Sequence, residues 1–279
     1  MYILLTERSD RLGSNMFLHL SRICLAIENK YYIYYNKNIK YSNIPYVKAL
    51  LDYSDDHNRK LFIDGVPLSG KKIPSAYIDM EKILSKSVLK VQSDFISYLS
   101  SVCNFKTRIH KFLPPYSLPY DPRTTIVVHM RLDDVSKLRS NAIRSANVAI
   151  NCLNKDKCVS YLPFYKRVSQ SPIREEKIQE LIEIAMNEDK GKTEVVIVTT
   201  LGEKLKLPYK NIGGRDVSED IYFMSMAEVF IASKSTYSTL PLFFGNHKKV
   251  YYPIWDHGVF IGLNTKFDKT SNITYVEAG

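Results

Sequence analysis

Short apolar runs separated by polar segments are the main pattern of the chain, and they predict alternating strands and helices. The run Val229–Ala232 is bounded by polar residues, as in a strand buried on both faces, and Leu240–Phe244 restarts an apolar pattern that suits a helix. Thr125–Met130 and Glu194–Thr200 are runs of the kind found in buried parallel strands. Between them, Tyr161 to about Asn187 carries apolar residues at helical intervals. These elements together predict an α/β domain.

The N-terminal part shows a similar alternation. We expect strands at Tyr2–Leu5, Tyr31–Tyr35 and Lys60–Asp64, and a largely helical stretch at Met80–Leu99. Prolines then occur at 114, 115, 119 and 122, and closely spaced prolines resist both helix and central strand. We therefore place a linker there and predict two domains, at residues 1–120 and 124–279.

Composition narrows the class of protein. The chain has 279 residues, of which 45% are hydrophobic, so a folded protein is expected. No apolar run approaches the ~20 residues that a membrane-spanning helix needs, and the N-terminus is too charged for a signal peptide, so we expect a soluble, cytoplasmic protein without a membrane span. The net charge of +10 comes from scattered short groups of Lys and Arg, which favours a solvated surface over nucleic-acid binding.

A hydroxyl-rich link, Ser233–Ser238, joins the predicted strand at Val229–Ala232 to the helix that follows it. Unpaired N–H groups and the positive end of a helix dipole at such a link predict an anion site, most naturally for phosphate. The alternative is that the hydroxyls only cap the helix.

Two other segments carry candidate site residues. His129 and Arg131 emerge at the carboxyl end of a predicted strand, where ligands bind in α/β sheets, and both lie on one face because they are two residues apart. Near the N-terminus, Gly13 and Asn15 lie in a tight turn between a strand and a helix. The alternatives are a salt bridge from Arg131 to Asp133 or Asp134, and a structural turn at Gly13.

These three segments together resemble the fucosyltransferase superfamily, which includes α1,2-, α1,6- and protein O-fucosyltransferases. The turn at Gly13 is similar to the family's RLGNQM segment, and His129-x-Arg131 to its HxR element. Asp220 ahead of Met224-Ser225, followed by Ser235-Thr236, resembles the donor-binding segment. The matches touch about a fifth of the chain. Leu132 and Asp133 depart from the family's Arg and Gly, and Ser14 and Asn15 from its Asn and Gln.

The resemblance implies an α/β, GT-B-like fold, with two Rossmann-like domains facing across a cleft. It implies an inverting glycosyltransferase that moves fucose from GDP-fucose to a hydroxyl of a glycan or glycoprotein acceptor. Arg131 would be catalytic, as the stabiliser of the departing diphosphate. An inverting reaction also needs a base, and the carboxylates near the matched motifs are Glu7, Asp10 and Asp134. We rank Asp10 first, because the N-terminal turn should face the cleft from the acceptor domain. The implied donor-binding residues are His129, Asp220 (at the guanine base), Ser235, Thr236, Tyr237, Gly13 and Asn15.

We expect no metal and no cofactor beyond the nucleotide-sugar co-substrate. No two aspartates are separated by a single residue, so the DxD element with which other glycosyltransferases hold a cation is missing. Because Lys234, like Leu132 and Asp133, departs from the family pattern, a UDP-xylose-dependent xylosyltransferase of viral glycan synthesis is the alternative within the class. A nucleotide- or carbohydrate-binding protein without turnover is the alternative from another class.

Overall fold

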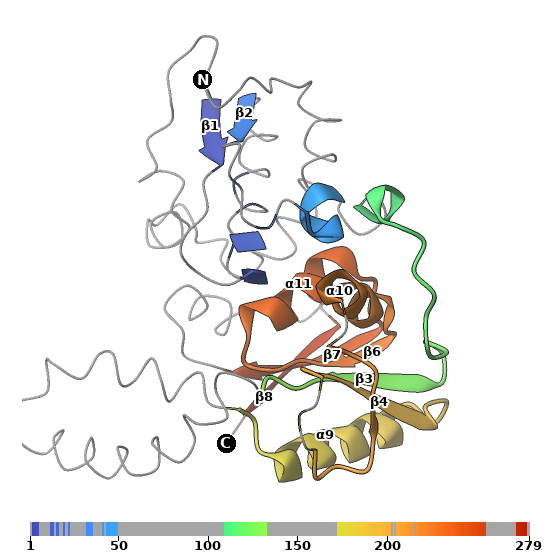
Figure 1. Cartoon of the computed structure of the whole chain (residues 1–279). Coiled ribbons are helices and arrows are strands. Elements are labelled where there is room, and N and C mark those ends of the chain that lie inside the picture. The colour runs from blue at the N-terminus through green and yellow to red at the C-terminus, as the bar shows by residue number, and fades with distance from the viewer. Residues whose placement is uncertain are drawn as a thin grey trace, which may run out of the picture.

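The computed structural model contains two parallel sheets (Figure 1). It describes residues 2–5, 12–13, 15–16, 19, 22, 32–35, 41, 43–49, 109–132, 172–201, 203, 205–214, 216–254 and 272–277. The expected strand at Lys60–Asp64, the helical stretch at Met80–Leu99 and the first part of Tyr161–Asn187 lie outside these residues. In the described part, no helix is long and apolar enough to cross a membrane.

The larger sheet has six strands in the order β5-β4-β3-β6-β7-β8, and every pairing in it is parallel. Its strands are β3 (Thr125–His129), β4 (Glu194–Val198), β5 (Lys210–Asn211), β6 (Val229–Ile231), β7 (Lys249–Ile254) and β8 (Ile273–Glu277). Numbered along the chain within this sheet, the order is 3-2-1-4-5-6, which is the strand order of the Rossmann fold. The prediction of an α/β fold is confirmed.

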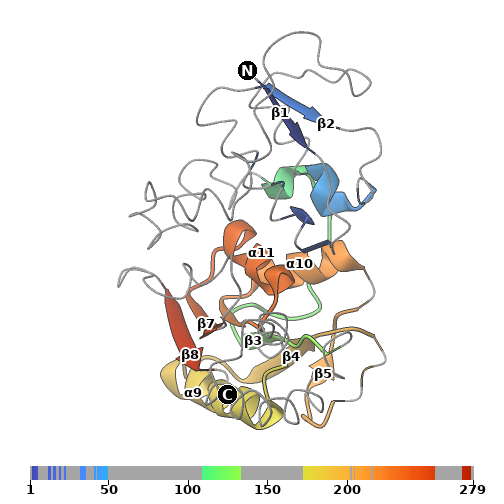
Figure 2. The same cartoon turned by 90° about the vertical axis from the view of Figure 1, so that its left-hand side faces the viewer.

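Helices cover both faces of this sheet. Helix α9 (Glu175–Glu188) lies on one face, and α10 (Val217–Met226) and α11 (Thr236–Phe244) lie on the other, as Figure 1 and Figure 2 show. This sandwich explains why the central strands are apolar on both faces, since β3 and β6 are buried throughout. The predicted strands at Thr125–Met130, Glu194–Thr200 and Val229–Ala232 and the predicted helix at Leu240–Phe244 are confirmed within one to four residues at their ends.

Alternate residues of each strand face opposite layers. Ile126, Val128 and Met130 belong to one buried cluster with the α9 side chains Ile178 and Leu181. His129 lies between Val128 and Met130 in the chain, so it faces the α10 and α11 layer instead. This register decides which polar residues can meet at the end of β3.

The smaller sheet pairs β1 (Tyr2–Leu5) with β2 (Tyr32–Tyr35) in parallel, which confirms both N-terminal strand predictions. It lies beyond α10 and α11 from the six-stranded sheet (Figure 2). Residues 45–49 are helical, and the Tyr46 backbone N–H donates to Ser218 Oγ at 3.2 Å on α10. The Tyr46 ring contacts Phe244 of α11, with 5.1 Å between centroids.

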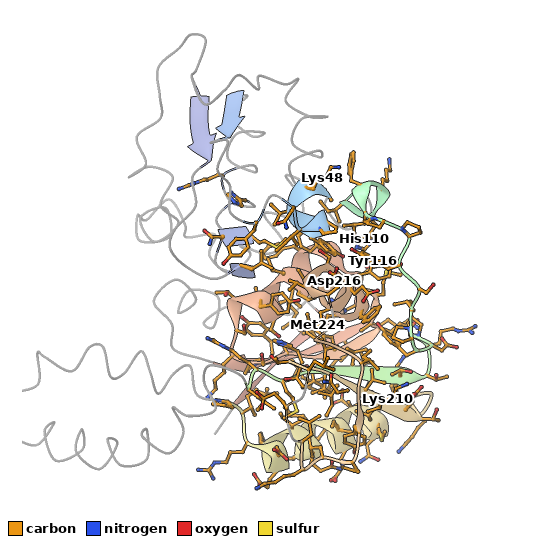
Figure 3. The ribbon with its side chains drawn as sticks, viewed as in Figure 1. Lys48, His110, Tyr116, Lys210, Asp216 and Met224 are labelled. Carbon is orange, nitrogen blue, oxygen red and sulfur yellow. The ribbon has the colours of Figure 1, made fainter. Side chains whose placement is uncertain are left out.

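Aromatic side chains connect the segment before β3 to the same helices. The short 3-10 helix η3 (Ile109–Phe112) carries His110, whose ring lies 5.6 Å from that of Tyr222 on α10, and Tyr116 lies 5.4 Å from the same ring. Figure 3 shows His110 and Tyr116 beside α10, near Asp216, which is the N-cap of this helix. From 113 to 124 the chain forms no helix or strand, as its prolines predict.

A buried lysine joins the amino ends of three central strands. Lys192, just before β4, donates from Nζ to the carbonyls of Pro122 and Arg123 at 2.8 and 2.7 Å and to Glu228 Oε2 at 3.0 Å. Pro122 and Arg123 precede β3, and Glu228 precedes β6. All three ammonium protons therefore have an acceptor, as burial of a charge requires.

We expect Lys192→Met to lower the free energy of unfolding by about 3 kcal/mol, because it leaves the two carbonyls without their donor and removes one of the two ammonium groups that pair with Glu228. Urea unfolding followed by circular dichroism measures this. Lys190→Met is the control: Lys190 is exposed and, among the described residues, pairs with Asn187, so its change is expected within about 0.5 kcal/mol. Equal stabilities of the two variants would show that the three-strand junction contributes little.

Candidate functional site

The candidate site lies where the strand order of the large sheet reverses, between β3 and β6. The chain leaves β3 toward β4 on one side and leaves β6 toward β7 on the other, so the two exits diverge at the carboxyl edge. In open α/β sheets, ligands bind at this position. Two hydrogen bonds cross it: His129 Nδ1 with Ser233 Oγ at 2.7 Å, and Arg131 Nη1 to the Lys234 carbonyl at 3.2 Å.

His129 is buried and neutral. Burial, with the nearby Arg131 guanidinium, lowers the pKa of its imidazole to about 3. The ring lies 5.5 Å from that of Tyr237 on α11, and Nδ1 shares its hydrogen bond with Ser233. His129 can therefore donate or accept a hydrogen bond at the site, but at neutral pH it adds no positive charge.

The hydroxyls of the link after β6 cap the helix that follows. Ser235 is the N-cap of α11, and its Oγ accepts the backbone N–H of Tyr237 at 3.2 Å. The backbone N–H of Ser233 donates to Ser238 Oγ at 2.8 Å, and Thr239 Oγ1 donates to the Ser235 carbonyl at 3.2 Å. The capping alternative thus describes part of this link. The positive end of α11 still lies at the switch point beside Arg131.

The predicted turn at Gly13 is helical in the structure, since residues 12, 13, 15 and 16 are all helical, and this segment reaches the same helix start. A Cβ at Gly13 would lie 2.8 Å from the Tyr237 backbone nitrogen and 2.9 Å from Thr236 Oγ1, so a side chain there would clash. Gly13 and the neighbouring Asn15 are both buried. A segment near the N-terminus therefore meets α11, and the close approach gives a steric reason for glycine at position 13.

Asp220 lies in the first turn of α10, and its carboxylate is buried. Both oxygens accept the backbone N–H of Gly214, at 3.0 and 2.9 Å, and Gly214 has a φ of +84°. Burial raises the Asp220 pKa to about 7, although the Gly214 hydrogen bond works in the opposite direction. The carboxylate thus changes charge near neutral pH while it holds the loop that follows β5.

That loop contains polar residues that the sequence patterns did not indicate. Asn211 Oδ1 accepts the N–H groups of Thr199 and Gly213 at 3.2 and 3.0 Å, which joins the end of β4 to the loop. Thr199 Oγ1 is buried without a hydrogen-bond partner among the described residues. The adjacent glycines 213 and 214 are a sequence signal that could have indicated this turn.

Tyr237 connects the two helix starts that border the site. Its hydroxyl donates to the Val217 carbonyl at 2.7 Å in the first turn of α10. Since Asp220 follows one turn later, the start of α11 and the Asp220 loop are held together. The predicted donor residues thus fall into one neighbourhood: His129, Arg131, Ser235, Thr236, Tyr237 and Gly13 at the switch point, with Asp220 across α10.

Some expectations fall elsewhere. Asp10, Asp133 and Asp134 lie outside the described residues, so neither the predicted base nor the alternative salt bridge of Arg131 has a described position. In the described ranges, no group of three or more His, Cys, Asp or Glu side chains is placed to hold a metal ion.

Comparison of the chain with models of protein families, with curated proteins and with solved structures found no match. The candidate site is therefore defined by its geometry: a guanidinium, a helix start and a neutral imidazole lie at the reversal of strand order, and Gly13 of the N-terminal part approaches the helix start closely.

Proposed function

We propose that the protein is an inverting glycosyltransferase that moves a sugar from a nucleoside-diphosphate donor to a hydroxyl of a glycan or glycoprotein. One observation carries the proposal: Arg131 meets the start of α11 at the reversal of strand order, where a diphosphate would find both a guanidinium and a helix N-terminus. Resemblance of the same segments to fucosyltransferases supports the same class.

The reaction would place most of its new charge on the donor's leaving group. The acceptor oxygen forms a bond to the anomeric carbon while the bond from that carbon to the diphosphate oxygen breaks, and the acceptor proton passes to a base. Arg131 is suited to the departing diphosphate because its planar fork can donate two parallel hydrogen bonds. Asp10 is the base we propose, because it lies three residues before Gly13 in the sequence.

A GT-B arrangement of two Rossmann-like domains would let one domain bind the donor and the other bind the acceptor. The six-stranded sheet would bind the donor, and the N-terminal part, with its parallel pair β1–β2, would present the acceptor. The approach of Gly13 to Thr236 and Tyr237 supports this view, because it puts an N-terminal turn at the edge of the proposed donor site.

The base of the donor would be read at Asp220. Its two oxygens accept one N–H from Gly214, so lone pairs remain for a ligand. Guanine offers a carboxylate two donors, N1–H and its amino group, whereas uracil offers the single N3–H. GDP-fucose is therefore our first choice of donor and UDP-xylose the second.

The first prediction concerns Arg131. Arg131→Ala should lower kcat for sugar transfer by about 100- to 1000-fold, the usual effect of losing one preorganised stabiliser of transition-state charge. Arg131→Lys should fall in between, because it keeps a cation but loses the fork. Steady-state transfer assays with GDP-fucose and UDP-xylose measure both.

Arg123→Ala is the matched control, since that side chain is 81% exposed and pairs with Asp121 at the amino edge of the sheet. Its kcat should equal that of the native protein. A folded Arg131→Ala variant with kcat within a few-fold of native would contradict the mechanism. Nucleotide binding without any transfer or hydrolysis in the native protein would favour the binding-protein alternative.

The second prediction concerns Asp220 and pH. Only the ionised carboxylate accepts both guanine donors, and its raised pKa of about 7 means that ionisation increases as pH rises through neutrality. GDP affinity should therefore increase between pH 6 and pH 8. Calorimetry with GDP and UDP at both pH values measures this change and the base preference.

Asp220→Asn keeps the size of the side chain but not its charge, so it should lose both the preference for GDP and the rise with pH. Glu180→Gln, at an exposed carboxylate on α9 that pairs with Lys177, should change neither. If the native protein binds UDP more tightly than GDP, UDP-xylose becomes the proposed donor. If GDP affinity does not change with pH and is the same in Asp220→Asn as in the native protein, Asp220 does not recognise the base.

A further inference from the structure

Lys234 lies in the middle of the link that joins β6 to α11, between the two serines that contact His129 and cap the helix. Its carbonyl accepts the hydrogen bond from Arg131 Nη1 at 3.2 Å, which holds the guanidinium against the Lys234 backbone. Arg131 and Lys234, which both carry positive charge, thus follow adjacent strands at the same edge of the sheet.

The Lys234 side chain is half-buried, and burial lowers the pKa of its ammonium. Within the described residues, Nζ has no hydrogen-bond acceptor and no carboxylate partner. Lys192 shows what this fold supplies to a buried ammonium that is structural, namely three oxygen acceptors. Lys234 has the desolvation of a buried cation without the partners.

An anion would supply the missing counter-charge. The start of α11 directly follows Lys234, and its dipole also favours negative charge. A diphosphate has two charged groups, so Arg131 and Lys234 can each contact a separate phosphate, whereas on a monophosphate the two cations would share the oxygens of one group. Two cations therefore favour a diphosphate over a monophosphate.

We propose that Lys234 is a specificity-determining residue that binds the second phosphate of the donor, so that the site selects nucleoside diphosphates over nucleoside monophosphates. This inference rests on the proposed function, and it assigns a role to a residue that departs from the fucosyltransferase pattern. Lys234 and Arg131 together neutralise the negative charge of the leaving group.

The test measures the affinities of GDP and GMP, and of UDP and UMP, by calorimetry for the native protein and for Lys234→Met. Methionine keeps most of the apolar stem and removes the charge. We expect the diphosphate affinity to fall about 10- to 100-fold, the effect of one charge-assisted hydrogen bond, while the monophosphate affinity changes less than threefold. Lys234→Arg should recover at least part of the preference for diphosphate.

Lys248→Met is the control, because that ammonium is 68% exposed and pairs with Glu228 at the opposite edge of the sheet. Its affinities should match those of the native protein. The melting temperature gives a second, independent readout: Lys234→Met should melt at or above the native temperature without ligand, since the substitution removes a desolvated and unpaired charge.

The outcomes separate the two proposals. If the native protein prefers diphosphates and Lys234→Met keeps that preference, the inference is wrong and the proposed function stands. A large drop in the melting temperature of Lys234→Met would likewise assign Lys234 to structure and overturn the inference. If the native protein binds none of the four nucleotides, both the inference and the proposed function fail.

Discussion

The reversal of strand order between β3 and β6 is the constraint on which the rest of the structure depends. Because all six strands are parallel, their carboxyl ends lie at one edge, and the reversal leaves a point there that no connection crosses. Hydrogen bonds from His129 and Arg131 to the link after β6 bridge this point. The amino edge is joined instead by Lys192, so the ionic contacts that hold the central strands lie away from the proposed ligand.

Several charged or titratable groups at the candidate site are buried without full compensation. His129 is held neutral, Asp220 changes charge near pH 7 and the Lys234 ammonium is desolvated, and in each case burial is the largest cause of the pKa shift. Perturbed groups of this kind cluster where proteins bind and transform ligands. Because these groups lie at one edge of the sheet, we infer that the site binds a polar ligand with both negative charge and hydrogen-bond donors.

Local sequence patterns predicted the elements that are determined locally. The apolar runs at β3, β4 and β6 are buried on both faces, and Ser235 caps α11 as its residue type favours. The shared face of His129 and Arg131 followed from strand alternation. The resemblance to fucosyltransferases led to Asp220 and Gly13 but gave no account of their surroundings.

Contacts between distant segments were beyond such reasoning. The contact of Gly13 with Thr236 and Tyr237 depends on how the N-terminal turn packs against α11. The hydrogen bond from Gly214 to Asp220 depends on the positive φ of Gly214, in a loop whose sequence has no periodic pattern. The burial of Lys234 is a tertiary property too, because a lysine in a loop is exposed in most proteins.

Hydrogen–deuterium exchange with and without GDP tests most directly whether a nucleoside diphosphate binds at the reversal of strand order. The account predicts slower exchange at the end of β3, in the link 232–235, at the start of α11 and in the loop at 211–214. It predicts no change at the amino ends of β3 and β4 or in α9. Saturating GDP that leaves exchange at the end of β3 and the start of α11 unchanged, or that slows exchange only in α9, would contradict the account.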